Sequence, residues 1–380
     1  MIKKNIRFIR VTSGYVLNNL LATFFLLYYS FCNKFEISAE IGLTSSLILF
    51  FLQSFSGNAR SLLFLQINFL AQFFILRFAI SIILLILINV IFLVTNVNNY
   101  LLLIFLSTIF IFQWLFELIL LHNELKNKFI IFNEYILVTG FFISSFIFFD
   151  IFYTNKIFII FSIFLSYLVY QIIKFSIRIN LLSCSLLNQS NNKFRFLPFF
   201  SSFSLTLANF LWRLLIFFFC GKILAGIYFA AFSIGSLPGT IFNLTFRSKV
   251  ASYIIEKKKF TKKIFIISIL LFFFIIFYLT SFKYIYSDSN KIYLFTALIS
   301  ILGSPFMLQG LHFRQMLIQK LKISNKVFYI DVLYSLIIVL IIPLCFILGK
   351  KYLISFSFII SSLINYFMYR FAHHYYEKKI

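Results

Sequence analysis

The stretch GIYFAAFSIGSLPGTIFNLT, residues 226–245, stands out in a chain of 380 residues that contains 59 Phe. Small or polar residues recur at every fourth position and share one helical face: Ala231, Gly235, Gly239 and Asn243. Such a face lets the backbone of a neighbouring helix approach closely, and Pro238 removes a backbone hydrogen bond and permits a kink. The stretch therefore predicts an apolar helix that is tightly packed, hinged, or both.

The residues on either side of this stretch are apolar almost without interruption. Hydrophobic residues make up 62% of the chain and charged residues 12%, a balance that excludes a soluble core. A helix satisfies its own backbone in lipid and needs about 20 apolar residues to cross it. We therefore expect an all-α polytopic membrane protein with about twelve transmembrane helices, near residues 11–32, 40–59, 78–95, 99–121, 129–151, 157–177, 198–221, 226–247, 264–282, 292–313, 328–348 and 352–371.

The basic residues are distributed unevenly between the two sides of this predicted bundle. The chain has 34 Lys and Arg against 10 Asp and Glu. With the N-terminus in the cytoplasm, the outer side carries only Lys34, Lys156, Lys222, Lys283, Lys291, Lys350 and Lys351. The positive-inside rule then predicts that both termini are cytoplasmic. The net charge of +24 needs no nucleic-acid partner to explain it.

The longest polar interruption, NQSNNKFRF at residues 188–196, divides the predicted helices six and six. Several residues recur at a constant offset across this midpoint: Arg7 with Arg195, Phe8 with Phe196, Cys32 with Cys220, and Lys34 with Lys222. We predict two six-helix lobes, 1–187 and 198–380, joined by a cytoplasmic linker at 188–197. Lobes related by a parallel repeat are a known plan of transporters, with a binding site between them.

The span predicted at 198–221 carries a polar face, formed by Ser202, Thr206, Asn209 and Arg213. An arginine inside a membrane span normally faces a protein interior or a watery cavity, and its default interpretation is functional. A guanidinium group binds phosphate oxygens bidentately, which makes an anionic head group its natural ligand. The alternative is that Arg213 extends to the interface or pairs with a carboxylate for structural reasons.

Two further spans carry features of a transport site. The first span has Tyr15 and Asn19 on one polar face, although hydrogen bonding between helices explains such residues as well. The span at 292–313 contains Gly303 and Pro305, as the stretch at 226–245 contains its own glycines and proline. We predict hinge or packing positions in these two interrupted spans, at Gly235, Pro238, Gly239, Gly303 and Pro305.

The remaining polar residues predict no chemistry. Four charged residues lie near cytoplasmic span ends, where ion pairs are the simplest interpretation: Arg77, Glu117, Glu134 and Asp331. The four cysteines lack metal-ligand spacing, and no glycine-rich phosphate loop occurs. We therefore expect no metal, no cofactor and no ATP hydrolysis by this chain.

The segment GKILAGIYFAAFSIGSLPGTIFNLTFRSKVASY, residues 221–253, resembles the lipid-linked oligosaccharide flippases, that is, O-antigen (Wzx-type) and related polysaccharide-export proteins of the multidrug/oligosaccharidyl-lipid/polysaccharide superfamily. The matching residues are Arg213, which precedes this segment, and Gly221, Gly226, Tyr228, Ala231 and Pro238 within it. Trp212 stands where the family usually has Asp, so an Asp–Arg pair at this position is absent.

The resemblance implies two six-helix lobes in a V, with the first, second, seventh and eighth helices lining a central cleft. The implied cargo is a polyprenyl-diphosphate-linked oligosaccharide, flipped from the inner to the outer leaflet of a bacterial inner membrane by alternating access. Membrane lipids and other polysaccharide-assembly proteins are the implied partners.

Two other functions remain open at this stage. A membrane polymerase or glycosyltransferase would need outward acidic residues, for which Glu36 and Glu40 are the candidates, although a short loop with solvated charges explains them better. A drug or cation antiporter of the same superfamily would need a buried acid within a lobe, whereas the acids here are predicted at span ends.

Overall fold

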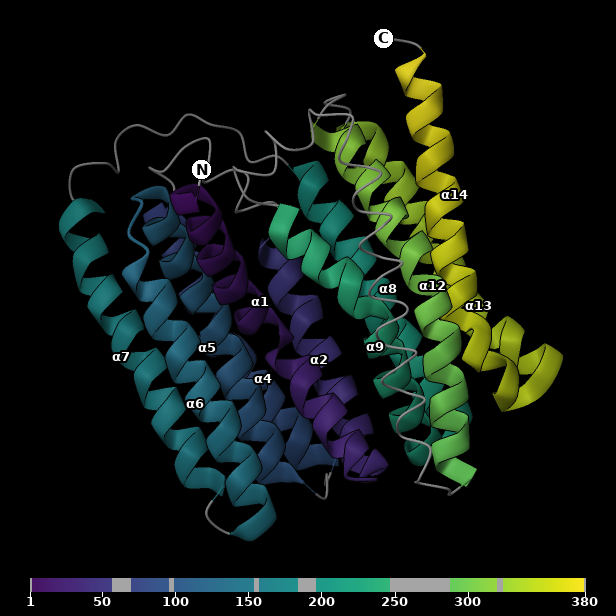
Figure 1. Cartoon of the computed structure of the whole chain (residues 1–380), viewed down its shortest axis with the longest axis horizontal. Helices are drawn as coiled ribbons and strands as arrows, with labels where there is room; N and C mark the ends of the chain where they lie inside the picture. Colours follow the sequence, from purple (N-terminus) through teal and green to yellow (C-terminus); the bar gives the residue numbers. More distant parts are fainter. Residues whose placement is uncertain are drawn as a thin grey trace. The chain divides into compact units, whose positions relative to one another are not determined.

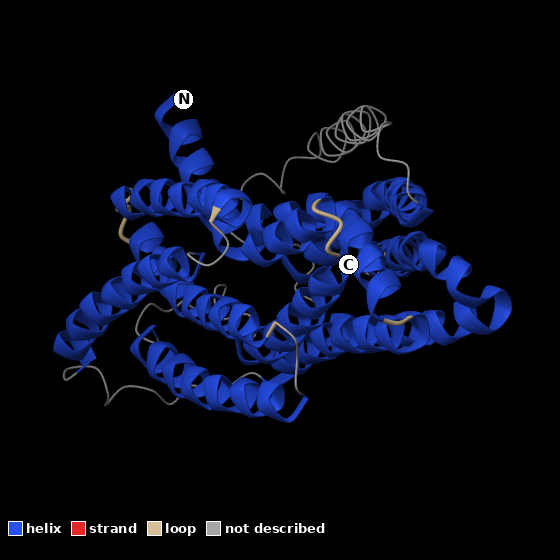
Figure 2. Cartoon of the chain, turned by 90° about the horizontal axis from the view of Figure 1, so that it is seen from below, coloured by secondary structure: helices blue, strands red, loops and turns tan. Residues whose placement is uncertain are grey.

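The computed structural model describes residues 2–56, 70–95, 99–153, 157–183, 196–246, 288–319 and 324–378. Throughout these ranges the chain is helical, with short turns and no strand (Figures 1 and 2). The all-α fold expected from the apolar runs is therefore confirmed.

Eleven of the twelve predicted spans coincide with described helices, and the span at 264–282 lies outside the described residues. Within the described part of the chain, ten helices are long and apolar enough to cross a membrane. The eleventh helix, α14, ends in the polar run RFAHHYYE. These helices confirm a multi-pass membrane protein.

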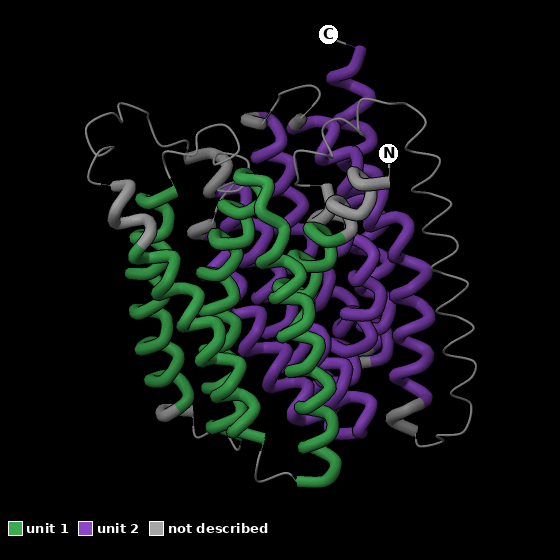
Figure 3. The backbone as a smooth tube through the Cα atoms, turned by 60° about the vertical axis from the view of Figure 1, so that its left-hand side comes forward, with its two compact units in different colours: residues 1–22, 58–194 green, residues 23–57, 195–380 purple. Residues whose placement is uncertain are grey.

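The helices form two compact units, coloured separately in Figure 3. Unit 1 comprises residues 1–22 and 58–194. Its helices are the first part of α1 (Ile2–Phe31), α4 (Leu70–Thr95), α5 (Tyr100–Leu125), α6 (Ile130–Phe152) and α7 (Ile157–Ser183).

Unit 2 comprises residues 23–57 and 195–380. It contains the end of α1 together with α2 (Phe35–Ser56), α8 (Phe196–Cys220), α9 (Lys222–Phe246), α12 (Asp288–Gln319), α13 (Ser324–Leu353), the short 3₁₀ turn η3 (Ile354–Phe356) and α14 (Ser357–Glu377). Within this unit α2 packs against α8 and α9. That residues 1–187 and 198–380 move as two separate lobes stays a prediction.

A buried polar triangle ties three helices of unit 1 together. The Asn18 side-chain amide donates to the backbone oxygen of Gln113 at 3.2 Å and accepts from the Tyr135 hydroxyl at 3.0 Å. The Gln113 amide donates to the same hydroxyl at 2.9 Å. Because buried polar groups are costly without partners, this triangle specifies how α1, α5 and α6 meet.

Close helix packing in unit 2 depends on glycines of α9. A Cβ atom added at Gly235 would lie 2.6 Å from the backbone oxygen of Ser300 in α12. The Ser304 hydroxyl of α12 also donates to the backbone oxygen of Gly235. A Cβ atom added at Gly226 would lie 1.9 Å from the backbone oxygen of Phe35 in α2. Both neighbouring backbones can come this close only because these positions lack a side chain.

The structure corrects the placement of one acidic residue at the start of α2. Glu40 was expected to be solvated in a loop, but it lies in the second turn of the helix and is 7% exposed. Its carboxylate pairs with the Lys222 ammonium of α9 at 2.5 Å. The reason is a tight turn at Asn33, whose φ is +58°, which lets α2 begin at Phe35, before the predicted boundary.

Candidate functional site

Arg213 of α8 extends toward α2 within unit 2. One terminal guanidinium nitrogen, Nη1, donates to the backbone oxygen of Gly42 at 2.7 Å and lies 3.3 Å from the Ser45 hydroxyl. The guanidinium carbon is 5.5 Å from the centre of the Phe229 ring of α9. Arg213 is therefore held between two helices by neutral groups.

The charge of Arg213 is not matched by any carboxylate within ion-pairing distance in the described part of the chain. Arg77 differs, because its Nη1 pairs with Glu117 at 3.1 Å; both residues were predicted to form ion pairs, without a partner being named. Arg314 is also paired, with Asp331. Arg213 is therefore a cation inside a membrane span that has neutral hydrogen-bond acceptors but, among the residues that the structure describes, no counter-charge.

The other polar residues of α8 are placed differently from one another. The Thr206 hydroxyl lies 3.2 Å from that of Ser54 in α2, so Thr206 and Arg213 both contact α2. Phe50 of α2 packs against Phe203 and Phe210 of α8 with ring centres 5.2 and 6.2 Å apart.

The remaining two predicted residues of α8 do not make a described contact with α2. Asn209 is exposed, and Ser202 is half-buried and accepts a hydrogen bond from Thr206 through its backbone oxygen. The structure thus brings Thr206 and Arg213 to a common neighbour and leaves Asn209 facing outward.

Tyr15 and Asn19 belong to unit 1 and take part in contacts within it. The fully buried Tyr15 hydroxyl donates to the Glu124 carboxylate at 2.8 Å. The Asn19 amide donates to the backbone oxygen of Tyr15 at 2.9 Å, one helical turn earlier. Interhelical or local hydrogen bonding therefore accounts for both residues, and their role in a cleft stays a prediction.

The predicted hinge residues lie in unbroken helices. Pro238 is inside α9 and Pro305 inside α12. A Cβ atom added at Gly239 would lie 3.1 Å from Leu311 of α12, and one at Gly303 would lie 3.0 Å from Phe358 of α14. These contacts show that the two glycines are packing positions. Bending at the two prolines stays a prediction. The side chain of Asn243 lies outside the described residues.

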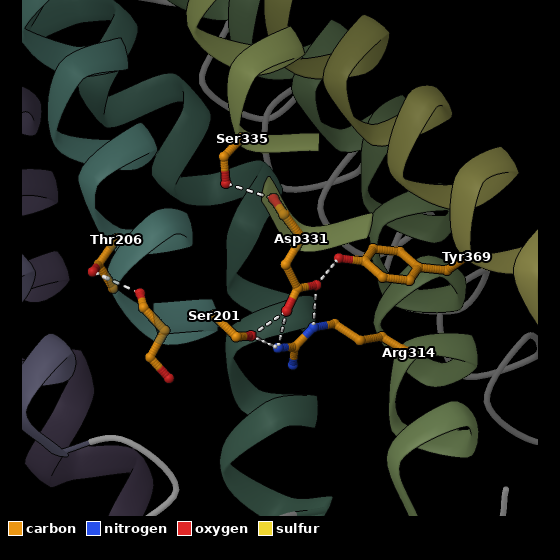
Figure 4. Close-up of polar contacts among 7 residues, drawn as sticks. Ser201, Thr206, Arg314, Asp331, Ser335 and Tyr369 are labelled. Carbon is orange, nitrogen blue, oxygen red and sulfur yellow. Dashed lines mark hydrogen bonds and ion pairs between the residues drawn. The ribbon is translucent and has the colours of Figure 1, made fainter. Parts of the chain in front are cut away.

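A buried cluster in unit 2 centres on Asp331 of α13, whose side chain is fully buried (Figure 4). Arg314 of α12 binds its carboxylate bidentately, with Nε to Oδ1 at 3.0 Å and Nη2 to Oδ2 at 2.7 Å. Ser201 of α8 and Tyr369 of α14 donate their hydroxyl hydrogens to the two carboxylate oxygens. Four helices therefore converge on one carboxylate.

For Asp331 an ion pair near a span end was predicted; the pair is present, but the carboxylate is fully buried and lies in a cluster that was not predicted. One signal could have revealed it, because Arg314 lies shortly before the end of α12 at Gln319 and Asp331 a similar distance after the start of α13 at Ser324. In two antiparallel consecutive helices, such positions lie side by side. The contributions of Ser201 and Tyr369 come from distant parts of the chain and left no such signal.

Comparisons with known proteins bear on the fold. No family model and no curated protein matches the chain. Solved structures match over nearly its full length, and three of them each have 13% sequence identity to it. One is a mutant of a MATE transporter, with a TM-score of 0.54 over 98% of this chain and 96% of that one.

The other two are conformations of a multidrug resistance MATE family transporter of the MOP superfamily. The outward-facing form has a TM-score of 0.53 and the inward-facing form 0.50. They cover 99% and 97% of this chain, and the match covers 96% and 94% of theirs, respectively. The likeness shows that this chain has the fold of MATE transporters.

Proposed function

We propose that the protein flips a polyprenyl-diphosphate-linked oligosaccharide from the inner to the outer leaflet of a bacterial cytoplasmic membrane, for the synthesis of a surface polysaccharide of the O-antigen kind. The fold shared with MATE transporters supports transport by alternating access. The observation that carries the choice of substrate is the uncompensated charge of Arg213 within the span of α8.

The physical argument is one of charge balance. A cation within the hydrocarbon region is costly unless it is paired or solvated, and its neighbours here are neutral. The Gly42 oxygen and the Ser45 hydroxyl orient the guanidinium without neutralising it. A diphosphate can supply the missing negative charge, and its oxygens can accept several hydrogen bonds from the guanidinium N–H groups at once. The polyprenyl tail would remain in the bilayer while the head group crosses beside Arg213.

The acidic residues of unit 2 favour an anionic substrate over a cationic one. A cation or drug antiporter needs a carboxylate that is available to its substrate. Asp331 is buried but already neutralised by Arg314, and Glu40 is neutralised by Lys222. The pairing of Glu40 also weakens the alternative of a polymerase or glycosyltransferase that would use this residue in catalysis. We therefore propose no catalytic residue and no cofactor.

The remaining features of the proposal follow from the sequence. The excess of Lys and Arg on one side of the predicted bundle supports cytoplasmic N- and C-termini. The repeat across the midpoint supports lobes 1–187 and 198–380 as the bodies that rock against each other. We propose that other polysaccharide-assembly proteins supply and receive the glycan.

A flipping assay that reports the leaflet of a labelled polyprenyl-diphosphate glycan, in vesicles containing the purified protein, tests this function. Arg213→Ala should slow flipping by about tenfold or more, the factor expected for a lost charge-assisted hydrogen bond. Arg213→Lys should retain part of the rate because it keeps the charge. Arg10→Ala, which removes an exposed arginine of α1, is the matched control and should behave as the unmodified protein. An unchanged rate in Arg213→Ala would overturn the site assignment.

A further inference from the structure

A cavity of about 450 Å³ lies between the C-terminal ends of α12 and α14 in unit 2. Its lining combines aromatic rings with basic or titratable side chains: Phe313, Phe367, Arg370, Phe371, His373 and His374. It is separate from the Arg213 site, which lies between α2, α8 and α9. The proposed transport function assigns it no role.

One wall of this cavity is fixed by the interior of the unit. Phe313 of α12 packs against a buried cluster formed by Leu317, Val327 and Tyr369. Its ring also lies 5.4 Å from that of His373 in α14. The wall is therefore part of the packed helix contact and exists before any ligand binds.

The opposite wall faces away from the protein. Phe367 and Phe371 stack one helical turn apart on α14, with ring centres 6.3 Å apart. They are 47% and 70% exposed. The sequence predicts that the first part of α14 lies in the membrane, and exposed phenyl rings there offer a surface for an acyl chain, from which a small inorganic anion would gain nothing.

The cavity also presents a cation that none of the described carboxylates neutralises. Arg370 lies over the Tyr366 ring at 5.4 Å and donates a hydrogen bond to the hydroxyl of the same residue. Elsewhere in the described chain no carboxylate lies within ion-pairing distance of Arg370. His374 is exposed beside it. His373 lies 3.6 Å from Glu377 and is thus less available to a ligand.

The position of the cavity along α14 matches a membrane interface. Before Arg370 the helix reads SFIISSLINYFMY, and from Arg370 onward it reads RFAHHYYE. The cavity lies at this change from apolar to polar sequence. Aromatic and basic residues gather at the level of lipid head groups, where a ring can contact acyl chains while a cation contacts phosphate.

We propose that this cavity binds an anionic phospholipid of the phosphatidylglycerol class. Its phosphate would lie against Arg370 and His374, and one acyl chain would lie along Phe367 and Phe371. Basic pockets between membrane helices recognise anionic head groups in this way. The choice of a lipid follows from the lining, which combines exposed phenyl rings for an acyl chain with Arg370 and His374 for a phosphate.

The test uses the full chain in lipid nanodiscs that contain phosphatidylcholine with a minor share of phosphatidylglycerol. Native mass spectrometry then counts the phosphatidylglycerol that remains bound. We expect Arg370→Ala to reduce the bound lipid about fivefold, the factor that corresponds to about 1 kcal/mol for one basic contact at a membrane surface. Arg370→Lys should retain most of it. If Arg370→Ala does not fold, His374→Ala, at an exposed position, tests the same cavity.

The matched control is Lys174→Ala in α7. Lys174 also lies over a tyrosine ring, that of Tyr170 at 5.5 Å, but it does not line this cavity. This variant should bind phosphatidylglycerol as the unmodified protein does. Equal losses in Arg370→Ala and Lys174→Ala would overturn the proposal. Displacement of the bound phosphatidylglycerol by inorganic phosphate would also overturn it, because the cavity would then recognise a free anion and not a lipid.

Discussion

Arg314 and Asp331 form a bidentate ion pair between α12 and α13, with the two N···O distances at 3.0 and 2.7 Å. The carboxylate is fully buried and also accepts hydrogen bonds from Ser201 and Tyr369. A buried pair of this kind stabilises a fold only weakly, but the loss of one partner leaves the other charge stranded. The cluster therefore fixes how α8, α12, α13 and α14 meet.

Asp331→Ala should destabilise the protein by about 3–5 kcal/mol, because it leaves the Arg314 guanidinium without its counter-charge. The double variant Asp331→Ala/Arg314→Met should recover a large part of that loss, since neither charge is then buried. Thermal unfolding in detergent measures both. Equal unfolding temperatures for the single and double variants would show that the cluster acts through its hydroxyl groups and not through the ion pair.

Gly235→Ala should weaken the packing of α9 on α12. The added Cβ atom would lie 2.6 Å from a backbone oxygen, so one helix must shift, at a cost of about 1–3 kcal/mol. Gly140→Ala in α6 is the matched control, because a Cβ atom there meets nothing within 4 Å. Thermal unfolding should show a loss for the first variant and no loss for the second.

The helices could be predicted from the sequence because their determinants are local. A run of about 20 apolar residues specifies a span whatever its neighbours are. Even so, hydropathy placed the start of this span at residue 78, whereas the chain is already helical in α4 from Leu70 onward. It also started the second span at residue 40 and left Glu40 as a solvated loop charge, because hydropathy does not register the turn at Asn33. Helix ends depend on turn geometry, and a hydropathy window does not contain it.

The site could be predicted only where one residue carried the signal. Arg213 was identifiable because an arginine within an apolar run is rare in itself. That none of the described carboxylates lies beside it is a property of three helices, α2, α8 and α9, and follows only from their packing. The same holds for Ser201 and Tyr369, which reach Asp331 from helices far apart in the sequence.

Tyr135→Phe should loosen the polar triangle of unit 1. The Tyr135 hydroxyl donates to Asn18 and accepts from Gln113, so its removal leaves two buried groups without a partner. Such a loss costs about 1–3 kcal/mol. Tyr329→Phe, at a position that is 69% exposed, removes a hydroxyl of the same kind without this consequence. A comparison of their unfolding temperatures isolates the triangle.

Glu40→Gln should lower stability yet leave glycan export intact. The substitution removes the ion pair with Lys222 that connects α2 and α9, but the proposed substrate contact at Arg213 does not involve it. Export of the lipid-linked glycan in cells, normalised to the amount of protein in the membrane, checks this. A complete loss of export at normal protein levels would favour the enzyme alternative, in which this carboxylate takes part in catalysis.

Ser45→Asp should abolish flipping without unfolding the protein. The Ser45 hydroxyl lies 3.3 Å from Nη1 of Arg213, so a carboxylate at this position can neutralise the guanidinium. The ion pair would offset the cost of burying the new carboxylate, and this carboxylate would compete with the diphosphate for the N–H donors of Arg213. Ser45→Asn introduces a side chain with nearly the shape of Asp but no charge, and this variant should keep most of the flipping rate. If the Asp and Asn variants flip the glycan equally well, the uncompensated charge of Arg213 has no part in substrate binding.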